Sequence, residues 1–210
     1  GGAPGTVNII DYITIASAGN AIDFGDLTVG RTDHGGLSSS TRGLFGGGYS
    51  PNPSPAKQSV NVIDYVEIAT LGNALDFGDL TIKPYTHSGC SSPTRGIFTG
   101  GFSYLAPSPG SRVPEFNPAS MSEMGSFIIA SFGSFTEFGD LSRKRSTSTG
   151  VSTKTRGVFA GGVESFPTRI NTIDYITFSS AGNAIDFGEL IRASSEPSGM
   201  SDSHGGLGGF

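Results

Sequence analysis

Short apolar stretches rich in Ile, Val and Tyr recur along the chain and are separated by glycine-containing turns. Three of them share the pattern Asn-x-Ile-Asp-Tyr and lie at 8–12, 61–65 and 171–175. They are too short for stable helices, and β-branched and aromatic residues are typical of strands. The Gly-Asn-Ala triplets that follow them favour turns, because Gly and Asn tolerate positive φ. The pattern therefore predicts an all-β chain without a persistent helix.

Further sequence blocks recur in a fixed order, which predicts a repeat architecture. Asp-Phe-Gly-Asp-Leu or a close variant lies at 23–27, 76–80, 137–141 and 186–190. Thr-Arg-Gly, an apolar residue, Phe and a Gly-Gly pair lie in order at 41–48, 94–101 and 155–162. We expect one repeat domain over 1–210 with units of about 50 residues. The units are approximately 1–31, 32–84, 85–145 and 146–192, with 193–210 completing the first.

The two chain ends look like parts of one unit. Residues 203–210 resemble the segment at 33–37, and the start of the chain resembles the sequence that follows a Gly-Gly pair. Strand pairing between the ends would remove a bare sheet edge, which otherwise invites aggregation. We therefore expect a ring of four units closed across the N- and C-termini. Alternatively, several chains complete one another's units head to tail. Because the chain does not begin with Met, we expect a processed product or a piece of something longer.

The unit resembles the kelch repeat of β-propellers. The resemblance rests on Gly-Gly pairs at 47–48, 100–101 and 161–162, on Tyr12, Tyr65 and Tyr175, and on Phe24, Phe77, Phe138 and Phe187 where kelch repeats carry Trp. The third unit departs from the pattern, because Ser126 stands where the others have Tyr. The amino-acid sequence of the repeat is similar to kelch-like repeats in structural proteins of tailed phages from aquatic environments. The resemblance implies a β-propeller-like ring and a virion or extracellular protein, such as a tail-fibre adhesin.

Composition and charge exclude several classes of fold and of partner. Glycine supplies 33 of 210 residues and only 15% are charged, which argues against a helix bundle or a coiled coil. A net charge of −5 argues against nucleic acid as a partner. The chain has no run of 18 apolar residues, so we expect no membrane span. The single cysteine, Cys90, excludes an intramolecular disulfide.

The variable loops are the first candidate for a binding surface, because repeat proteins carry insertions on one face. Residues 49–60 and 102–120 are rich in Pro, Ser and aromatic residues. The candidate ligand-binding aromatics are Tyr49, Phe102, Tyr104, Phe116 and Phe166. Exposed aromatics stack on sugars and anchor protein interfaces, although they can also pack on their own loops. The expected partners are a cell-surface receptor or glycan, or other virion subunits, with a homo-oligomer as a further possibility.

Repeated polar residues form the second set of candidates. His34, His87 and His204 look equivalent between units, and in a propeller they would lie at the mouth of the central channel. They could bind a metal or an anion there, or only line a wet channel. Arg42, Arg95 and Arg156 are expected to bridge to Asp11, Asp64 or Asp174 of adjacent units. The Asp-Phe-Gly blocks are expected to be structural, with Phe as a core wedge and the carboxylates capping turns.

No catalytic constellation emerges from the sequence. Cys90 has no visible activating neighbour, and most carboxylates belong to the repeated blocks. We assign no catalytic residue, metal or cofactor, and expect a non-enzymatic protein that presents loops to a receptor or glycan. The alternatives are a structural subunit that polymerises by donated β-strands and a sugar-active enzyme with a channel site. The enzyme would use an unrepeated carboxylate such as Glu115 or Glu164.

Overall fold

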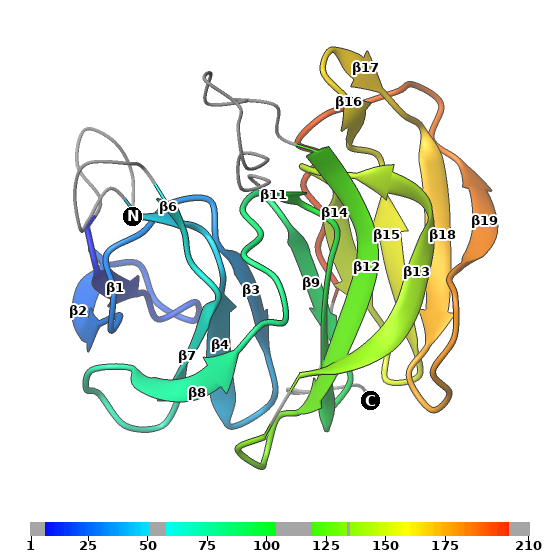
Figure 1. Ribbon diagram of the computed structural model, residues 1–210. Helices are drawn as coiled ribbons and strands as arrows, with labels where there is room; N and C mark the ends of the chain where they lie inside the picture. The colour runs from blue at the N-terminus through cyan, green and yellow to red at the C-terminus, as the bar shows by residue number, and fades with distance from the viewer. Residues whose placement is uncertain (1–6, 51–57, 104–118, 134, 202–210) are drawn as a thin grey trace, which may run out of the picture.

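The computed structural model describes residues 7–50, 58–103, 119–133 and 135–201 and is built from antiparallel strands (Figure 1). No helix occurs among these residues, which confirms the all-β prediction. In the same part of the chain there is accordingly no helix with the length and apolarity needed to cross a membrane.

Three large sheets make up most of the structure, and each comes from one stretch of the sequence. Sheet I contains β3 (Gly35–Ser38), β4 (Arg42–Gly46), β7 (Val62–Glu67) and β8 (Leu75–Asp79). Sheet II contains β9 (Ser88–Ser91), β10 (Arg95–Thr99), β12 (Ala119–Ile128) and β13 (Thr136–Arg145), and β11 (Phe102–Ser103) pairs with the start of β12. Sheet III contains β14 (Thr149–Ser152), β15 (Arg156–Ala160), β18 (Thr172–Thr177) and β19 (Ile185–Glu189).

Smaller elements flank these sheets. The N-terminal pair consists of β1 (Ile9–Tyr12) and β2 (Ile22–Asp26). Two short hairpins are β5 (Tyr49–Ser50) with β6 (Gln58–Ser59) and β16 (Val163–Ser165) with β17 (Thr168–Arg169). The N-terminal pair and sheets I, II and III follow one another across the molecule (Figure 1), with β9 in contact with both β3 and β14. The predicted strands at 8–12, 61–65 and 171–175 are confirmed as parts of β1, β7 and β18.

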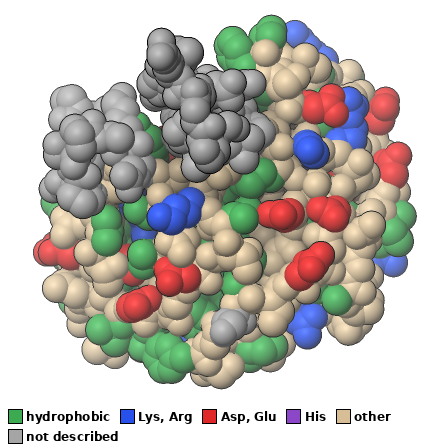
Figure 2. Space-filling model, viewed as in Figure 1, with side chains coloured by type: hydrophobic (Ala, Val, Ile, Leu, Met, Phe, Trp, Pro, Cys, Tyr) green, Lys and Arg blue, Asp and Glu red, His purple; other side chains and the backbone are tan. Residues whose placement is uncertain are grey.

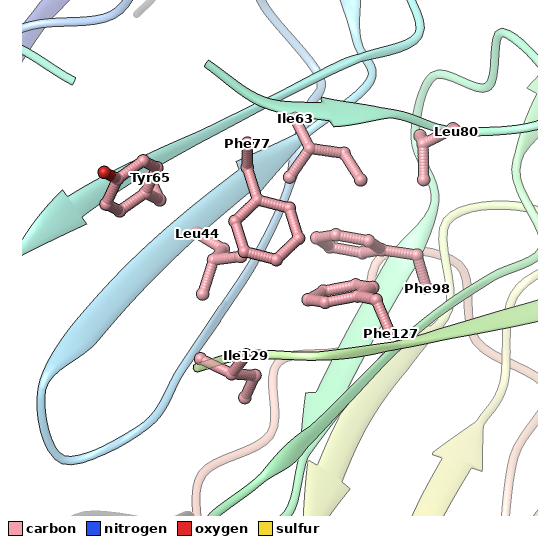
Figure 3. Packing of buried hydrophobic residues seen from close by; sticks show 8 residues of the cluster. All are labelled: Leu44, Ile63, Tyr65, Phe77, Leu80, Phe98, Phe127 and Ile129. Carbon is pink, nitrogen blue, oxygen red and sulfur yellow. The ribbon is translucent and has the colours of Figure 1, made fainter. Parts of the chain in front are cut away.

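Aromatic side chains fill the space between neighbouring sheets. Phe24, Phe77 and Phe138, from equivalent Asp-Phe-Gly blocks, are all buried, which confirms their predicted role as wedges. Phe77 of sheet I faces Phe98 and Phe127 of sheet II (Figure 3), and the ring centroids of Phe77 and Phe127 are 5.3 Å apart. Such edge-on aromatic pairs add to the free energy of burial. The core is therefore made between the units rather than within each one.

At two junctions the glycine of the Asp-Phe-Gly block lets the next unit approach closely. Gly25 and Gly139 both have a φ of +147°, and a Cβ on either would lie 2.3 Å from the carbonyl oxygen of Gly72 or Gly182. Backbone bonds fix this approach: the amide of Gly72 donates to the Phe24 carbonyl at 2.9 Å, and the amide of Gly182 donates to the Phe138 carbonyl at 2.6 Å. The Asp-Phe-Gly and Gly-Asn-Ala motifs of neighbouring units are thus two halves of one contact.

The described sheets form an open array with the N-terminal pair at one end and sheet III at the other (Figure 1). At the sheet III end, Phe187 is 60% exposed, unlike its buried equivalents. A Cβ on Gly188 would meet nothing within 4 Å, and neither would one on Gly19 of the N-terminal pair. The predicted closure falls on residues 1–6 and 202–210, which lie outside the described residues, so it stays a prediction.

Candidate functional site

Three aromatic rings form a row at one end of the sheets. The short strands β5, β11 and β16 lie at this end (Figure 1), and isolated bridges pair Thr32 with Tyr49 and Tyr85 with Phe102. Ring centroids are 6.0 Å apart between Tyr49 and Tyr85 and 5.7 Å apart between Tyr85 and Phe102. We call Tyr49, Tyr85 and Phe102 the loop-end aromatic row. Tyr49 and Phe102 were predicted from the sequence as ligand-binding aromatics. Tyr85 was not predicted, because it lies in a connection outside the repeated blocks.

The other loop candidates are not part of this row. Phe166 lies on the turn between β16 and β17 at sheet III and is 88% exposed. Tyr104 and Phe116 lie outside the described residues. The structure therefore brings together two of the five predicted aromatics, Tyr49 and Phe102, through Tyr85.

Two of the three candidate histidines lie near the contact between sheets I and II. His87 is 7% exposed, and its ring centroid lies 5.2 Å from that of Phe98. A Cβ on Gly35 would lie 2.6 Å from Nε2 of His87, so the imidazole packs directly against the backbone of sheet I. Among the described residues, neither ring nitrogen of His87 has a hydrogen-bond partner. His87 is therefore buried between sheets rather than facing open solvent.

Burial keeps both histidines neutral. Desolvation is the main cause that lowers the pKa of His87 from 6.5 to about 3, and repulsion from His34 and Arg31 contributes to the same shift. Desolvation is also the main cause that lowers the pKa of His34 to about 4. At neutral pH each imidazole therefore offers one N–H donor and one acceptor nitrogen.

A repeated backbone conformation marks the position of His34 in each described unit. Asp33, Thr86, Thr147 and Glu196 all have positive φ, between 51° and 57°. Backbone hydrogen bonds of 2.8–2.9 Å link them in series. The amide of Thr86 donates to the carbonyl of Asp33, that of Thr147 to the carbonyl of Thr86, and that of Glu196 to the carbonyl of Thr147. Each of these residues immediately precedes the position of His34 in its own unit. Pro197 therefore takes the position of His34 in the last described unit. His204 lies outside the described residues, so its place at the channel mouth stays a prediction.

We expect stability to fall as the pH drops below about 6.5, because unfolding lets the buried histidines take up protons. The pKa of His87 is about 3 in the folded protein against 6.5 for an exposed imidazole. Between these values the unfolded chain binds the extra proton, so each pH unit costs about 1.4 kcal/mol. Urea unfolding at pH 7, 6 and 5 measures this slope. His87→Gln should remove the contribution of His87 to the pH dependence of the free energy of unfolding. An unchanged pH dependence in this variant would contradict the lowered pKa of His87.

Two fully buried ion pairs lie inside the sheets. Nη2 of Arg31 lies 2.9 Å from Oδ2 of Asp64, and Nη2 of Arg145 lies 2.5 Å from Oδ2 of Asp174. All four side chains are 0% exposed. Each carboxylate also accepts bonds from the backbone amide and hydroxyl of one residue, Thr28 for Asp64 and Ser142 for Asp174. Burial lowers the pKa of both arginines, and the attraction of the paired carboxylate opposes that shift.

The predicted bridges from Arg42, Arg95 and Arg156 to these aspartates were therefore wrong. The three arginines lie over aromatic rings instead, at 4.8 Å from Tyr65 for Arg42, 5.9 Å from Phe138 for Arg95 and 5.0 Å from Tyr175 for Arg156. Arg42 does reach the adjacent sheet, because it donates to the carbonyl of Ile129 at 2.9 Å.

The carboxylates of the Asp-Phe-Gly blocks cap turns, as predicted, in three units. Oδ1 of Asp23, Asp76 and Asp186 accepts the amide of the glycine two residues later, at 3.1, 2.9 and 2.8 Å. Sheet II has the longer Glu137 at this position. That side chain contributes instead to the lining of a cavity.

This cavity lies where sheet II lacks the buried ion pair. By strand register, Phe98 opposes Gly125 as Phe45 opposes Asp64, so Gly125 replaces the aspartate. Pro84 takes the position of Arg31, two residues before the positive-φ Thr86. A Cβ on Gly125 would lie 1.5 Å from the ring of Phe135, which takes part of the vacated space. What remains is a cavity of about 320 Å³, the sheet II cavity.

Cys90 and Glu164 are the described residues among those considered for chemistry. Cys90 is buried, and desolvation raises the pKa of its thiol. Glu164 forms an ion pair with Arg143 at 2.5 Å near the surface. Glu115 lies outside the described residues. Within the described residues, no three His, Cys, Asp or Glu side chains are grouped closely enough to hold a metal ion.

No protein-family model and no curated protein matches the chain. Among solved structures it is similar to YjhT, with a TM-score of 0.67 over 84% of this chain and 57% of that chain. The chain thus spans little more than half the length of YjhT. At 10% sequence identity the likeness concerns the fold alone.

Proposed function

We propose that the chain forms a β-propeller-like ring of kelch-type units closed across its termini. On this proposal it is a non-enzymatic virion or extracellular protein that presents loops to a receptor or glycan. The observation that carries the binding role is the loop-end aromatic row, in which Tyr49, Tyr85 and Phe102 lie in sequence with 5.7–6.0 Å between neighbouring rings. The row joins two units at the end of the sheets where β6 and β11 lie (Figure 1).

The rings of the row are held in place before a ligand binds, which favours binding. Each ring of the row is attached to a strand or to a backbone bridge, so little side-chain freedom is lost when a ligand binds. Tyr combines a flat apolar face with a hydroxyl, which suits both a sugar ring and a protein surface. The partly exposed rings are therefore able to act as anchors for a partner.

Binding to a glycan array or to host cells tests the proposal. Tyr49→Ala and Phe102→Ala should each weaken binding at least about tenfold, the usual cost of losing an anchor residue. Leu71→Ala is the matched control, because Leu71 is exposed on the hairpin between β7 and β8 at the opposite end (Figure 1). Equal binding by the aromatic variants and this control would reject the aromatic row as the binding surface.

A second candidate function is assembly by head-to-tail contacts, and the two ends of the array favour it. The N-terminal pair ends in a free Gly19-Asn20-Ala21 turn, the same motif that docks on Asp-Phe-Gly within the array. At the other end, Phe187 and Gly188 offer that docking surface uncovered. The two surfaces are complementary, so they can close one chain into a ring or join successive chains. The native mass in solution separates these outcomes, because a ring stays monomeric and a chain-to-chain contact gives larger particles.

A further inference from the structure

We propose that the sheet II cavity binds a small organic cation, specifically a guanidinium group on a short apolar stem. The cavity lies at the position in sheet II that a buried arginine occupies in sheets I and III. It adds a ligand site that is separate from the loop-end aromatic row.

The first argument is the missing arginine. In sheet I the guanidinium of Arg31 donates to the carbonyls of Phe45 at 3.0 Å and Val62 at 3.2 Å. By strand register the equivalent residues in sheet II are Phe98 and Glu123, and both line the cavity. Sheet II thus keeps these two backbone positions, whereas Pro84 replaces the arginine and Gly125 replaces its aspartate partner.

The second argument is the charge of the lining. Glu123, Glu137 and Asp140 line the cavity, and no Lys or Arg is among its described lining residues. Asp140 is oriented by the hydroxyl of Ser122, which donates to its Oδ1 at 2.9 Å. Asp and Glu side chains also gather on the surface over β12 and β13 (Figure 2). A cation is attracted to this mouth, whereas an anion is repelled.

The third argument is His87. This buried side chain lines the cavity, and neither of its ring nitrogens has a partner in the described part of the chain. A buried polar atom without a partner costs free energy, which a donor on a ligand would recover. A neutral imidazole has one acceptor nitrogen, and a guanidinium has only donors. The two groups are therefore complementary.

The apolar residues of the lining indicate the kind of stem that the guanidinium carries. Leu80, Ile82, Met124 and Phe135 face a space of about 320 Å³, near the lower end of the range for small-molecule sites. A short alkyl stem fills such a space, while the charged group stays with the carboxylates. This combination selects an alkylguanidinium over an inorganic cation.

Titration calorimetry with butylguanidinium tests the site, with butylurea as the uncharged probe of the same shape. Butylguanidinium should bind at least about tenfold more tightly than butylurea, because the uncharged probe lacks a charge-assisted hydrogen bond of about that value. Glu137→Gln with Asp140→Asn should abolish the preference. The matched control is Asp76→Asn with Asp79→Asn, the equivalent carboxylates of sheet I, which should leave it unchanged. Equal binding of the two probes, or an equal loss in both double variants, would overturn the proposal.

A second variant tests the position of the site. Pro84→Arg, Gly125→Asp and Phe135→Ala together restore in sheet II the residues of the other sheets, so an internal guanidinium should fill the cavity. This variant should no longer bind butylguanidinium. If it folds and binds the probe as the wild type does, the site lies elsewhere. If it does not fold, the surface variants Glu137→Gln and Asp140→Asn still decide the proposal.

Discussion

Replacing Asp64 by Ala is expected to lower the free energy of unfolding by about 3–5 kcal/mol, because it leaves Arg31 as an uncompensated buried charge. Both side chains are 0% exposed, so water cannot replace the lost carboxylate. Thr28 also loses the acceptor of its amide and its hydroxyl. Urea unfolding monitored by circular dichroism measures the change.

Two further variants separate the buried charge from the loss of a side chain. Arg31→Met with Asp64→Leu removes both charges and should recover most of the stability, since an apolar replacement of a buried pair is often neutral. Glu67→Ala removes the partner of Arg42 in a pair whose glutamate is half exposed, and should cost at most about 1 kcal/mol. A double variant as unstable as Asp64→Ala would show that the pair itself stabilises the sheet.

Sheet II already carries such a replacement. Pro84 and Gly125 remove both charges at once, and Phe135 fills part of the space where the other units have Ala74 or Ala184. The three changes make physical sense only together, because either charge alone would be buried without a partner. They also leave the cavity that is specific to this sheet.

Local pattern was sufficient to predict the strands of the repeated Asn-x-Ile-Asp-Tyr blocks and the turns that follow them, but not the ten-residue strands β12 and β13. The stretch Val62–Glu67 is rich in β-branched and aromatic residues and is followed by a Gly-Asn turn, and these properties depend only on neighbouring residues. The buried role of Phe77 also followed from repetition, because a residue kept in every unit is structural.

The ion pairs and the cavity could not be predicted in the same way. Arg31 lies outside the repeated blocks, and its partner Asp64 is 33 residues away, so proximity in sequence gives no hint of the contact. A signal was present, however: Arg and Asp occur together at 31 and 64 and at 145 and 174, and are absent together at 84 and 125. The predicted pairing of Asp64 with the repeated arginines was wrong because those side chains lie over aromatic rings.

Gly139→Ala is expected to be among the most destabilising single substitutions, and Gly188→Ala is its matched control. Both glycines have positive φ, +147° and +138°, so alanine is strained at either position by about 1–3 kcal/mol. Only at Gly139 would the new Cβ also meet the next unit, 2.3 Å from the carbonyl oxygen of Gly182. In an open array, Gly139→Ala should therefore lower the free energy of unfolding by several kcal/mol more than Gly188→Ala.

The same pair of variants tests whether the two ends meet. If Gly19 of the same or another chain docks on Gly188, as the proposed ring or assembly requires, Gly188→Ala should become as costly as Gly139→Ala. An assembly would also show a loss of particle mass in the Gly188→Ala variant, measured by light scattering, while a ring would lose stability at constant mass. If Gly188→Ala costs no more than the backbone strain and leaves the mass unchanged, no contact as close as that of Gly139 with Gly182 forms at Gly188, because a carbonyl cannot lie within 3 Å of a Cβ without a shift.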